Sequence, residues 1–391
     1  MRFVRQLAVL LAAVWVAGAQ TRSPVDAAWD LVARGQREEA VRLLRGFVAK
    51  EPANADARML LGSLLMEAGD KQGSVEQLSA AVKLRPRSAE SHNALGEAYD
   101  MAGDAKSAKP EFEKAVALDP RHAQAQANLG GALLQLGDAK SAAPHLDAAI
   151  RLLGAKPEAA HARYLRGRIY LDERDYPKAV QQLELAVKLA PDFAEAWSDL
   201  GEARKNLFED DAALAAFEKS VQLNPDGAVA QTRYGTKLLD AGRNREAAEH
   251  LRVALRTDPR NQSTLNALQL ALRRDGQAAE ADEVKKRLED VIRSRDRGDQ
   301  ALVAAIEINN RGAELEKSGN VRGALDNYRE ALNVYPDHVG IRVNLAVALL
   351  KTGQWEEGLA QMREALRRDP DNSQIKAALA DAESQYKTGR K

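Results

Sequence analysis

The chain has 391 residues, 45% of them hydrophobic and 29% charged, and its 57 basic and 57 acidic side chains leave no net charge. This balance argues against nucleic acid as the main partner, because binding phosphates needs a basic surface. Aromatic residues make up only 5%, which argues against a β-rich fold. Cysteine is absent, which excludes disulfides and thiolate metal sites.

The first 19 residues have the layout of a secretory signal peptide. Arg2 and Arg5 precede an apolar run from Leu7 to Val16, and small residues follow up to Ala19. We expect cleavage after Ala19, with an uncleaved membrane anchor as the alternative. Nothing after Gln20 resembles a membrane span, and no cysteine is present to be lipidated. The sequence therefore predicts an exported protein, either periplasmic or secreted.

Beyond this leader the sequence repeats with a period of 34 residues. A proline marks the period at Pro52, Pro86 and Pro120, then at Pro157, Pro191, Pro225 and Pro259, and finally at Pro336 and Pro370. A fixed period of this length is typical of a repeat array, in which each repeat packs only on its neighbours.

The repeat over residues 89–122 shows the pattern most clearly. Its marker residues are Leu95, Gly96, Tyr99, Gly103, Asp104, Ala108, Phe112, Ala115 and Pro120. The apolar markers have the spacing of two amphipathic helices, while the glycine and aspartate allow a turn between the helices and the proline ends the second one. This pattern resembles the tetratricopeptide repeat, W-x2-L-G-x2-Y followed by A-x3-F, A and P. The resemblance implies an all-α fold, a right-handed superhelical solenoid of antiparallel helix pairs.

Counting by this template divides the chain into segments. The signal peptide takes residues 1–19, repeats 1–8 take 20–295, an insert or kink takes 296–304, repeats 9–10 take 305–372, and a capping helix with a tail takes 373–391. The eighth repeat is degenerate, because Lys285 stands where an aromatic residue or leucine belongs and no proline follows at position 293. We expect a long charged helix over about residues 278–297 that breaks near Gly298.

The sequence offers no catalytic or cofactor-binding constellation. Its six histidines are scattered without metal-ligand spacing, and it contains no nucleophile elbow, P-loop or dinucleotide-binding glycine motif. The carboxylates are dispersed along amphipathic helices. We therefore predict a protein without enzymatic activity, metal or cofactor.

The resemblance places binding on the concave face, which the first helix of each repeat lines. Template positions 2, 5, 9, 12 and 13 of a repeat should point into this groove. At the N-terminal end they include an apolar strip of Trp29, Met59, Met66 and Met101, rimmed by Asp56, Glu67, Glu97 and Asp100. Methionine adapts to varied apolar partners and an acidic rim favours basic ones, so we predict a basic, apolar peptide or protein partner. The alternative is that these side chains pack between neighbouring helices.

The predicted function is a non-catalytic scaffold for protein–protein interaction that holds a peptide or partner protein in its groove. Two alternatives stay open at this stage. One is an envelope scaffold for polysaccharide export or assembly, a role that exported repeat arrays resembling this one have. The other is a self-assembling structural solenoid, because the end of a solenoid is apolar unless it is capped.

Overall fold

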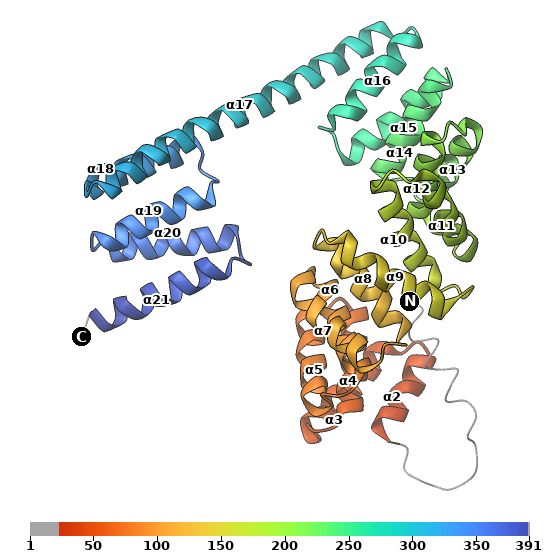
Figure 1. Cartoon of the computed structure of the whole chain (residues 1–391), viewed down its shortest axis with the longest axis horizontal. Helices are drawn as coiled ribbons and strands as arrows, with labels where there is room; N and C mark the ends of the chain where they lie inside the picture. Colours follow the sequence, from red (N-terminus) through yellow and green to blue (C-terminus); the bar gives the residue numbers. More distant parts are fainter. Residues whose placement is uncertain (1–22, 390–391) are drawn as a thin grey trace. The chain divides into compact units, whose positions relative to one another are not determined.

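The computed structural model describes residues 23–389, so the predicted signal peptide lies outside the described residues. This part of the chain contains twenty α-helices and no β-strand (Figure 1). Among its helices we find none that combines the length and the apolar character needed to cross a bilayer. The helices fall into two compact units that divide after Thr257.

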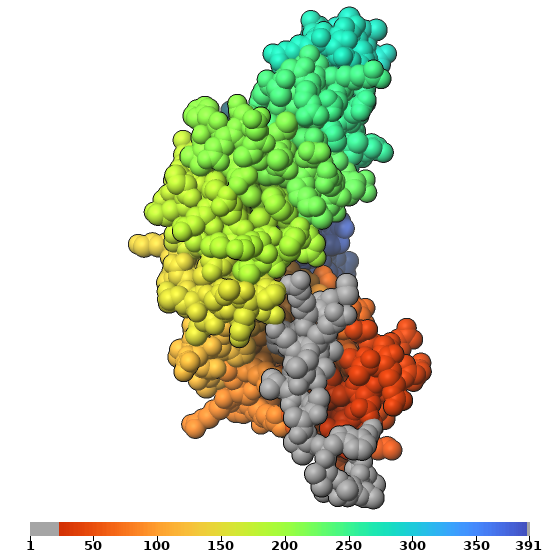
Figure 2. All heavy atoms as spheres, turned by 90° about the vertical axis from the view of Figure 1, so that its right-hand side faces the viewer, coloured from red at the N-terminus to blue at the C-terminus, as the bar shows by residue number. Residues whose placement is uncertain are grey.

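Unit 1 consists of seven antiparallel helix pairs. Each pair has a first and a second helix: α2 (Pro24–Ala33) and α3 (Arg37–Lys50), α4 (Ala55–Glu67) and α5 (Lys71–Leu84), α6 (Ala89–Met101) and α7 (Ala105–Leu118), α8 (Ala123–Gln135) and α9 (Ala139–Leu153), α10 (Ala159–Asp172) and α11 (Tyr176–Leu189), α12 (Ala194–Asn206) and α13 (Asp210–Leu223), α14 (Ala228–Asp240) and α15 (Asn244–Thr257). Within this unit, each second helix from α3 to α13 also packs on the first helix of the next pair. The colours of unit 1 in Figure 2 accordingly succeed one another from red to green along the stack. The predicted all-α solenoid of helix pairs is confirmed.

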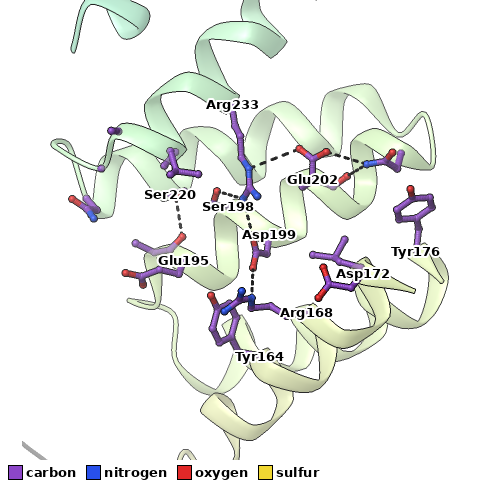
Figure 3. Close-up of a pocket in the computed structure, with 18 residues that line it drawn as sticks. Tyr164, Arg168, Asp172, Tyr176, Glu195, Ser198, Asp199, Glu202, Ser220 and Arg233 are labelled. Carbon is purple, nitrogen blue, oxygen red and sulfur yellow. Dashed lines mark hydrogen bonds and ion pairs between the residues drawn. The ribbon is translucent and has the colours of Figure 1, made fainter. Parts of the chain in front are cut away.

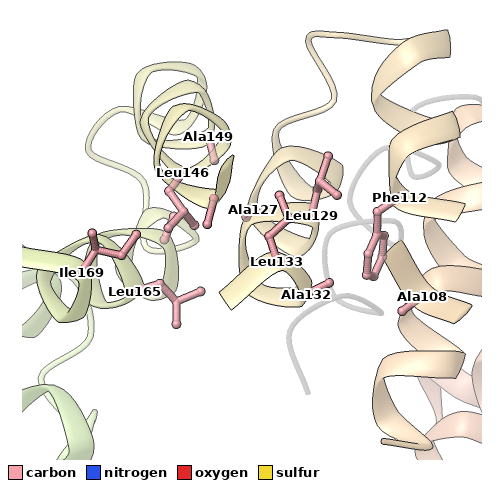
Figure 4. Close-up of a cluster of buried hydrophobic side chains, with 12 residues drawn as sticks. Ala108, Phe112, Ala127, Leu129, Ala132, Leu133, Leu146, Ala149, Leu165 and Ile169 are labelled. Carbon is pink, nitrogen blue, oxygen red and sulfur yellow. The ribbon is translucent and has the colours of Figure 1, made fainter. Parts of the chain in front are cut away.

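The hydrophobic core runs from one repeat into the next. One cluster joins Phe112 of α7, Leu129 and Leu133 of α8, Leu146 of α9 and Ile169 of α10 (Figure 4). All five side chains are buried. Because no repeat can bury its apolar face alone, the stack of repeats is the unit of stability.

The turns between the two helices of a repeat require a left-handed backbone. Glycine occupies this position in eight of the ten turns, with φ between 76° and 85°. The exceptions are Arg174 with φ 60° and Phe208 with φ 61°. A side chain in this region of φ brings its β-carbon close to a carbonyl oxygen, which costs roughly 1–2 kcal/mol. Repeats 5 and 6 thus carry a conformational cost that the other repeats avoid.

Unit 2 contains the remaining helices. They are α16 (Gln262–Arg274), α17 (Ala278–Lys317), α18 (Val321–Val334), α19 (Val339–Lys351), α20 (Trp355–Arg368) and α21 (Ser373–Gly389). A core of Ala305, Tyr328 and Leu345 joins α17, α18 and α19. At the end of the unit, Ile375 of α21 is buried with Met362 and Ala365 of α20.

The expected break near Gly298 is wrong, because α17 is one helix of 40 residues (Figure 1). It joins the second helix of repeat 8 to the first helix of repeat 9. No proline ends it, and a single exposed glycine inside a helix costs only about 1 kcal/mol relative to alanine. Charged pairs on neighbouring turns, such as Lys285 with Glu289 at 3.7 Å, support the helix on the N-terminal side of Gly298.

Repeat 9 presents a polar face where other repeats receive a neighbour. The preceding second helix is the other half of α17, so it cannot pack beside the first helix of repeat 9. At the buried template positions 3, 7 and 10, which hold Ser91, Leu95 and Ala98 in repeat 3, repeat 9 has the exposed residues Glu307, Arg311 and Glu314. These three side chains line an open hollow of about 930 Å³. Their charge suits a solvent-facing end of a repeat stack, as terminal repeats require.

Candidate functional site

The first helices of unit 1 form a continuous inner face. Successive first helices contact one another, α4 with α6, α6 with α8, α8 with α10, α10 with α12 and α12 with α14. We call the surface formed by template positions 2, 5, 9, 12 and 13 of these helices the groove.

The apolar strip predicted at the N-terminal end is largely built into the packing. Trp29 lies against the buried cluster of repeats 1 and 2, and Met59 and Met66 pack against a second buried cluster that includes Leu78 and Leu95. Only Met101, with 51% of its surface exposed, stands well out of the protein. The first three side chains are therefore only partly accessible to a partner, whereas about half of the Met101 surface is accessible.

The four acidic side chains of the predicted rim all have hydrogen-bond partners within the chain. Two are paired with arginine: Asp56 accepts two hydrogen bonds of 2.6 Å from Arg85, and Glu67 lies 3.1 Å from Nε of Arg37. The other two accept only from amides. Glu97 accepts from Asn93 and Asn128, and Asp100 accepts from Nε2 of Gln135 at 2.7 Å. The rim therefore keeps uncompensated charge at Glu97 and Asp100, beside the exposed Met101.

A second feature of the groove lies in repeats 5 to 7, where a hollow of about 680 Å³ opens (Figure 3). Its lining includes Tyr164, Arg168 and Asp172 of α10, Glu195, Ser198, Asp199, Glu202 and Asn206 of α12, and Val229 and Arg233 of α14. The sequence interpretation missed this site because it considered only the two ends of the array. The same template positions, applied to repeats 5 and 6, select Tyr164, Arg168, Asp172, Glu195, Ser198, Glu202 and Asn206.

Two arginines tie the walls of the hollow together through Asp199. Arg233 of α14 donates through Nη1 to Oδ1 of Asp199 at 2.7 Å and to Oγ of Ser198 at 2.8 Å. From α10, Nε of Arg168 lies 3.9 Å from Oδ2 of the same carboxylate (Figure 3). Asp199 is buried, so Arg233 is held between adjacent repeats, whereas the side chain of Arg168 stays about half exposed at the edge of the hollow. The Asp199 carboxylate partly offsets the positive charge of both arginines.

One wall of the hollow is aromatic. The centres of the Tyr164 and Phe193 rings lie 4.6 Å apart, and the guanidinium carbon of Arg168 lies 5.8 Å from the centre of the Tyr164 ring. Burial, reinforced by the Asp199 carboxylate, raises the pKa of Tyr164 above its ordinary value. The phenol therefore stays protonated at neutral pH and can donate a hydrogen bond to a ligand.

The groove of unit 1 is acidic although the chain as a whole is neutral. Among the described residues at its template positions, two are basic, Arg168 and Lys205. Nine are acidic: Asp56, Glu67, Glu90, Glu97, Asp100, Asp172, Glu195, Glu202 and Asp240. Such an excess of one sign along a concave surface attracts ligands of the opposite charge.

Comparison with known proteins agrees with this architecture. Tetratricopeptide repeat patterns match the chain at residues 25–89, 63–108, 93–160, 139–192 and 164–228, and again at 315–382. The chain therefore belongs to the tetratricopeptide repeat family. As a repeat protein of this family it is, in general terms, a scaffold for protein–protein interaction.

Each individual relative matches only part of this chain. Tetratricopeptide repeat protein 6 of Homo sapiens is 22% identical over 204 residues, 51% of this chain and 37% of that protein. The peroxisomal targeting signal receptor of Eremothecium gossypii is 29% identical over 107 residues, 27% of this chain and 19% of the receptor. The chain thus spans well under half the length of these curated relatives. The structure of pilF from Pseudomonas aeruginosa has a TM-score of 0.50 at 22% identity, covering 56% of this chain and 97% of that one, and it shows the shared fold.

Proposed function

We propose that the groove of unit 1 binds an extended, basic segment of a partner protein without catalysing a reaction. The observation that carries this proposal is the excess of nine acidic over two basic side chains at the groove positions. Lysine and arginine side chains of a partner would replace solvent around the carboxylates for which no arginine or lysine contact is seen among the described residues, such as Glu90, Glu97, Asp100 and Glu195. The relative named as a targeting signal receptor is consistent with such a role.

Two parts of the groove are assigned to the segment. At the N-terminal end, Glu97, Asp100 and Met101 supply charge and a flexible apolar contact, and the other members of the predicted site flank them: Trp29, Asp56, Met59, Met66 and Glu67. In the middle, the hollow between Tyr164, Glu195 and Glu202 accepts a larger side chain. Apolar residues between the basic ones would pack against Met101 and Val229, which are both exposed.

Fluorescence anisotropy with defined probes tests this proposal. The probes are short fluorescein-labelled peptides of alternating lysine and leucine, and matched peptides of glutamate and leucine. We expect the lysine peptide to bind and its affinity to fall as salt is added, because ions screen exposed charges beyond a Debye length of about 10 Å at 0.1 M. Equal binding of both peptides would refute the proposal.

A matched pair of variants locates the binding surface. Glu90→Lys with Glu195→Lys reverses two exposed groove positions, whereas Glu113→Lys with Glu249→Lys makes the same charge change on the second helices α7 and α15. The groove variant should weaken the lysine peptide about tenfold, since each rim charge contributes modestly. The second-helix variant should stay within about twofold of the unmodified chain. Equal losses in both variants would mean that net charge alone attracts the peptide.

We further propose that the protein acts outside the cytoplasm, on the basis of the leader predicted at residues 1–19. N-terminal sequencing of the protein recovered from the periplasm or the medium should start at Gln20. Recovery of an intact Met1 in the membrane fraction would support the anchor instead. Recovery in the cytosol with Met1 retained would contradict export.

A further inference from the structure

Phe208 is the most exposed large apolar side chain among the described residues, at 89% of its surface. It occupies the turn between α12 and α13, where its backbone N–H donates to the carbonyl of Lys205 at 3.0 Å. In repeat 3 the N–H of Gly103 makes the equivalent bond to Asp100 at 2.8 Å. Phe208 thus occupies a standard turn that normally takes glycine.

Fold stability does not account for a phenylalanine at this position. Its φ of 61° is unfavourable for a residue with a β-carbon, and the ring returns nothing through burial because it stays in water. Glycine would make the same turn without strain. A strained position that persists without a packing reason is a candidate contact for a partner.

The location of the strained turns supports the same conclusion. Arg174 and Phe208 are the only non-glycine residues with positive φ in the described chain, and they lie in adjacent repeats. Both turns adjoin the hollow, since Asp172 and Tyr176 on either side of Arg174 line it, as does Asn206, two residues before Phe208. The two turns that lack glycine therefore both lie beside the hollow.

The surroundings of the ring indicate a cationic ligand. Three carboxylates follow it in sequence: Glu209 lies 3.9 Å from Arg204, Asp210 is paired with Lys237, and Asp211 is exposed. An open aromatic face attracts a guanidinium group, which stacks on it while its aliphatic stem covers the ring edge. The chain itself shows this geometry one repeat earlier, where the guanidinium carbon of Arg166 lies 3.9 Å from the centre of the Tyr170 ring.

We propose that Phe208 is an anchor that binds an arginine side chain of the partner segment where this segment leaves the hollow. This inference rests on the proposed function, because it assigns one more contact to the same bound segment. It adds that arginine is preferred over lysine at this position, and that the strain in the turn is retained for binding.

Phe208→Gly tests the anchor, with Phe208→Tyr as the conservative variant and Arg174→Gly as the control at the equivalent turn. The probes are the alternating lysine–leucine peptide and an arginine–leucine peptide of the same length. Phe208→Gly should weaken the arginine peptide about tenfold, as loss of a binding anchor does, and weaken the lysine peptide less. Phe208→Tyr should stay within about twofold of the unmodified chain, and Arg174→Gly, which places glycine at the equivalent turn but removes a charge of the same sign as the peptides, should weaken neither peptide.

Thermal melting separates binding from folding. Phe208→Gly should melt at the same temperature as the unmodified chain or higher, because it relieves the left-handed strain. If it melts several degrees lower, or binds the arginine peptide as tightly as the unmodified chain, the anchor is refuted. If Phe208→Gly has no effect while Glu90→Lys with Glu195→Lys still weakens binding, only the anchor fails. If neither change affects binding, the proposed function fails as well.

Discussion

Asn128 of α8 donates a hydrogen bond from its side-chain amide to Oε1 of Glu97 on α6, across 2.8 Å. Asn93 of α6 donates to the same oxygen at 2.9 Å. Burial raises the pKa of the Glu97 carboxyl, the two amides oppose this shift, and the nearby Asp100 carboxylate adds to it, so that the pKa lies above its ordinary value of 4.5. The Glu97 carboxyl therefore binds its proton more tightly in the folded chain than in the unfolded chain.

This arrangement gives the groove a predictable pH dependence. A carboxyl group whose pKa is higher in the folded than in the unfolded state favours folding when it is protonated, and this contribution is lost as the pH rises through the folded-state pKa. Glu97→Gln keeps the shape and an accepting oxygen but removes the charge. We therefore expect the variant to melt at a higher temperature than the unmodified chain at about pH 7, and the difference to vanish below about pH 4.

The control for this change is Asp100→Asn, whose parent carboxylate is less enclosed and accepts a hydrogen bond of 2.7 Å from Gln135. It should shift the melting temperature less than Glu97→Gln at neutral pH. A Glu97→Gln variant that melts lower at neutral pH would mean that the carboxylate charge itself holds α6 and α8 together.

A second prediction concerns the glycine at template position 8 of the repeats. In repeat 3, a β-carbon on Gly96 would lie 2.5 Å from Cε1 of Phe112, so the aromatic ring would have to move. Gly96→Ala should destabilise the chain by about 1–3 kcal/mol, the usual cost of overpacking a core. Gly46→Ala in α3 is the matched control, because no atom lies within 4 Å of its β-carbon position. It should stabilise the chain by about 0.5–1 kcal/mol, and urea unfolding followed by circular dichroism measures both changes.

The contrast between these two glycines shows how far the sequence could predict the fold. Gly96 and Phe112 are both markers of the 34-residue period, and their spacing predicts the close crossing of two helices that the structure contains. The helix pairs and their turns followed from the same local signals. Proline ends a helix strongly, whereas one glycine in a charged helix does so weakly. The continuity of α17 through Gly298 depends on that difference, which the pattern alone did not resolve.

The candidate site was less predictable because groove positions also touch the neighbouring repeat. Met59 and Met66 stand at groove positions, yet both pack against the buried cluster that includes Leu78 and Leu95. Likewise, the arginine that neutralises Asp56 comes from the C-terminal end of α5, 29 residues away in sequence. Which groove side chains remain available depends on such contacts between repeats, and a single repeat's template does not contain them.

A third prediction concerns the polar face of repeat 9. Replacing Glu307 by Ala, Arg311 by Leu and Glu314 by Ala restores the small and apolar residues that buried repeat interfaces carry at these positions. The exposed apolar face should then associate with other copies, because the end of a repeat stack needs a polar cap to stay soluble. Sedimentation velocity over a concentration series should show a growing share of dimers or larger species.

The matched control places the same three exchanges, with the same spacing, on the exposed part of α17: Glu289→Ala, Arg293→Leu and Asp296→Ala. This stripe lies outside the first-helix positions 3, 7 and 10 that form repeat interfaces, so the variant should remain as monodisperse as the unmodified chain. Equal association of both variants would show that any apolar stripe suffices and that the repeat 9 face has no special role.

The final prediction concerns the continuity of α17. Because the chain has no cysteine, Glu283→Cys and Glu307→Cys provide two unique sites for spin labels on either side of Gly298. At 1.5 Å per residue, their backbones should lie about 36 Å apart, and pulsed electron paramagnetic resonance should give one narrow distance distribution. Gly298→Ala should leave the distribution unchanged. Gly298→Pro should shorten and broaden it, because proline removes a helix hydrogen bond and clashes with the preceding turn, at a cost of about 3 kcal/mol. A short, broad distribution in the unmodified chain would instead place a break at Gly298 and contradict the single 40-residue helix.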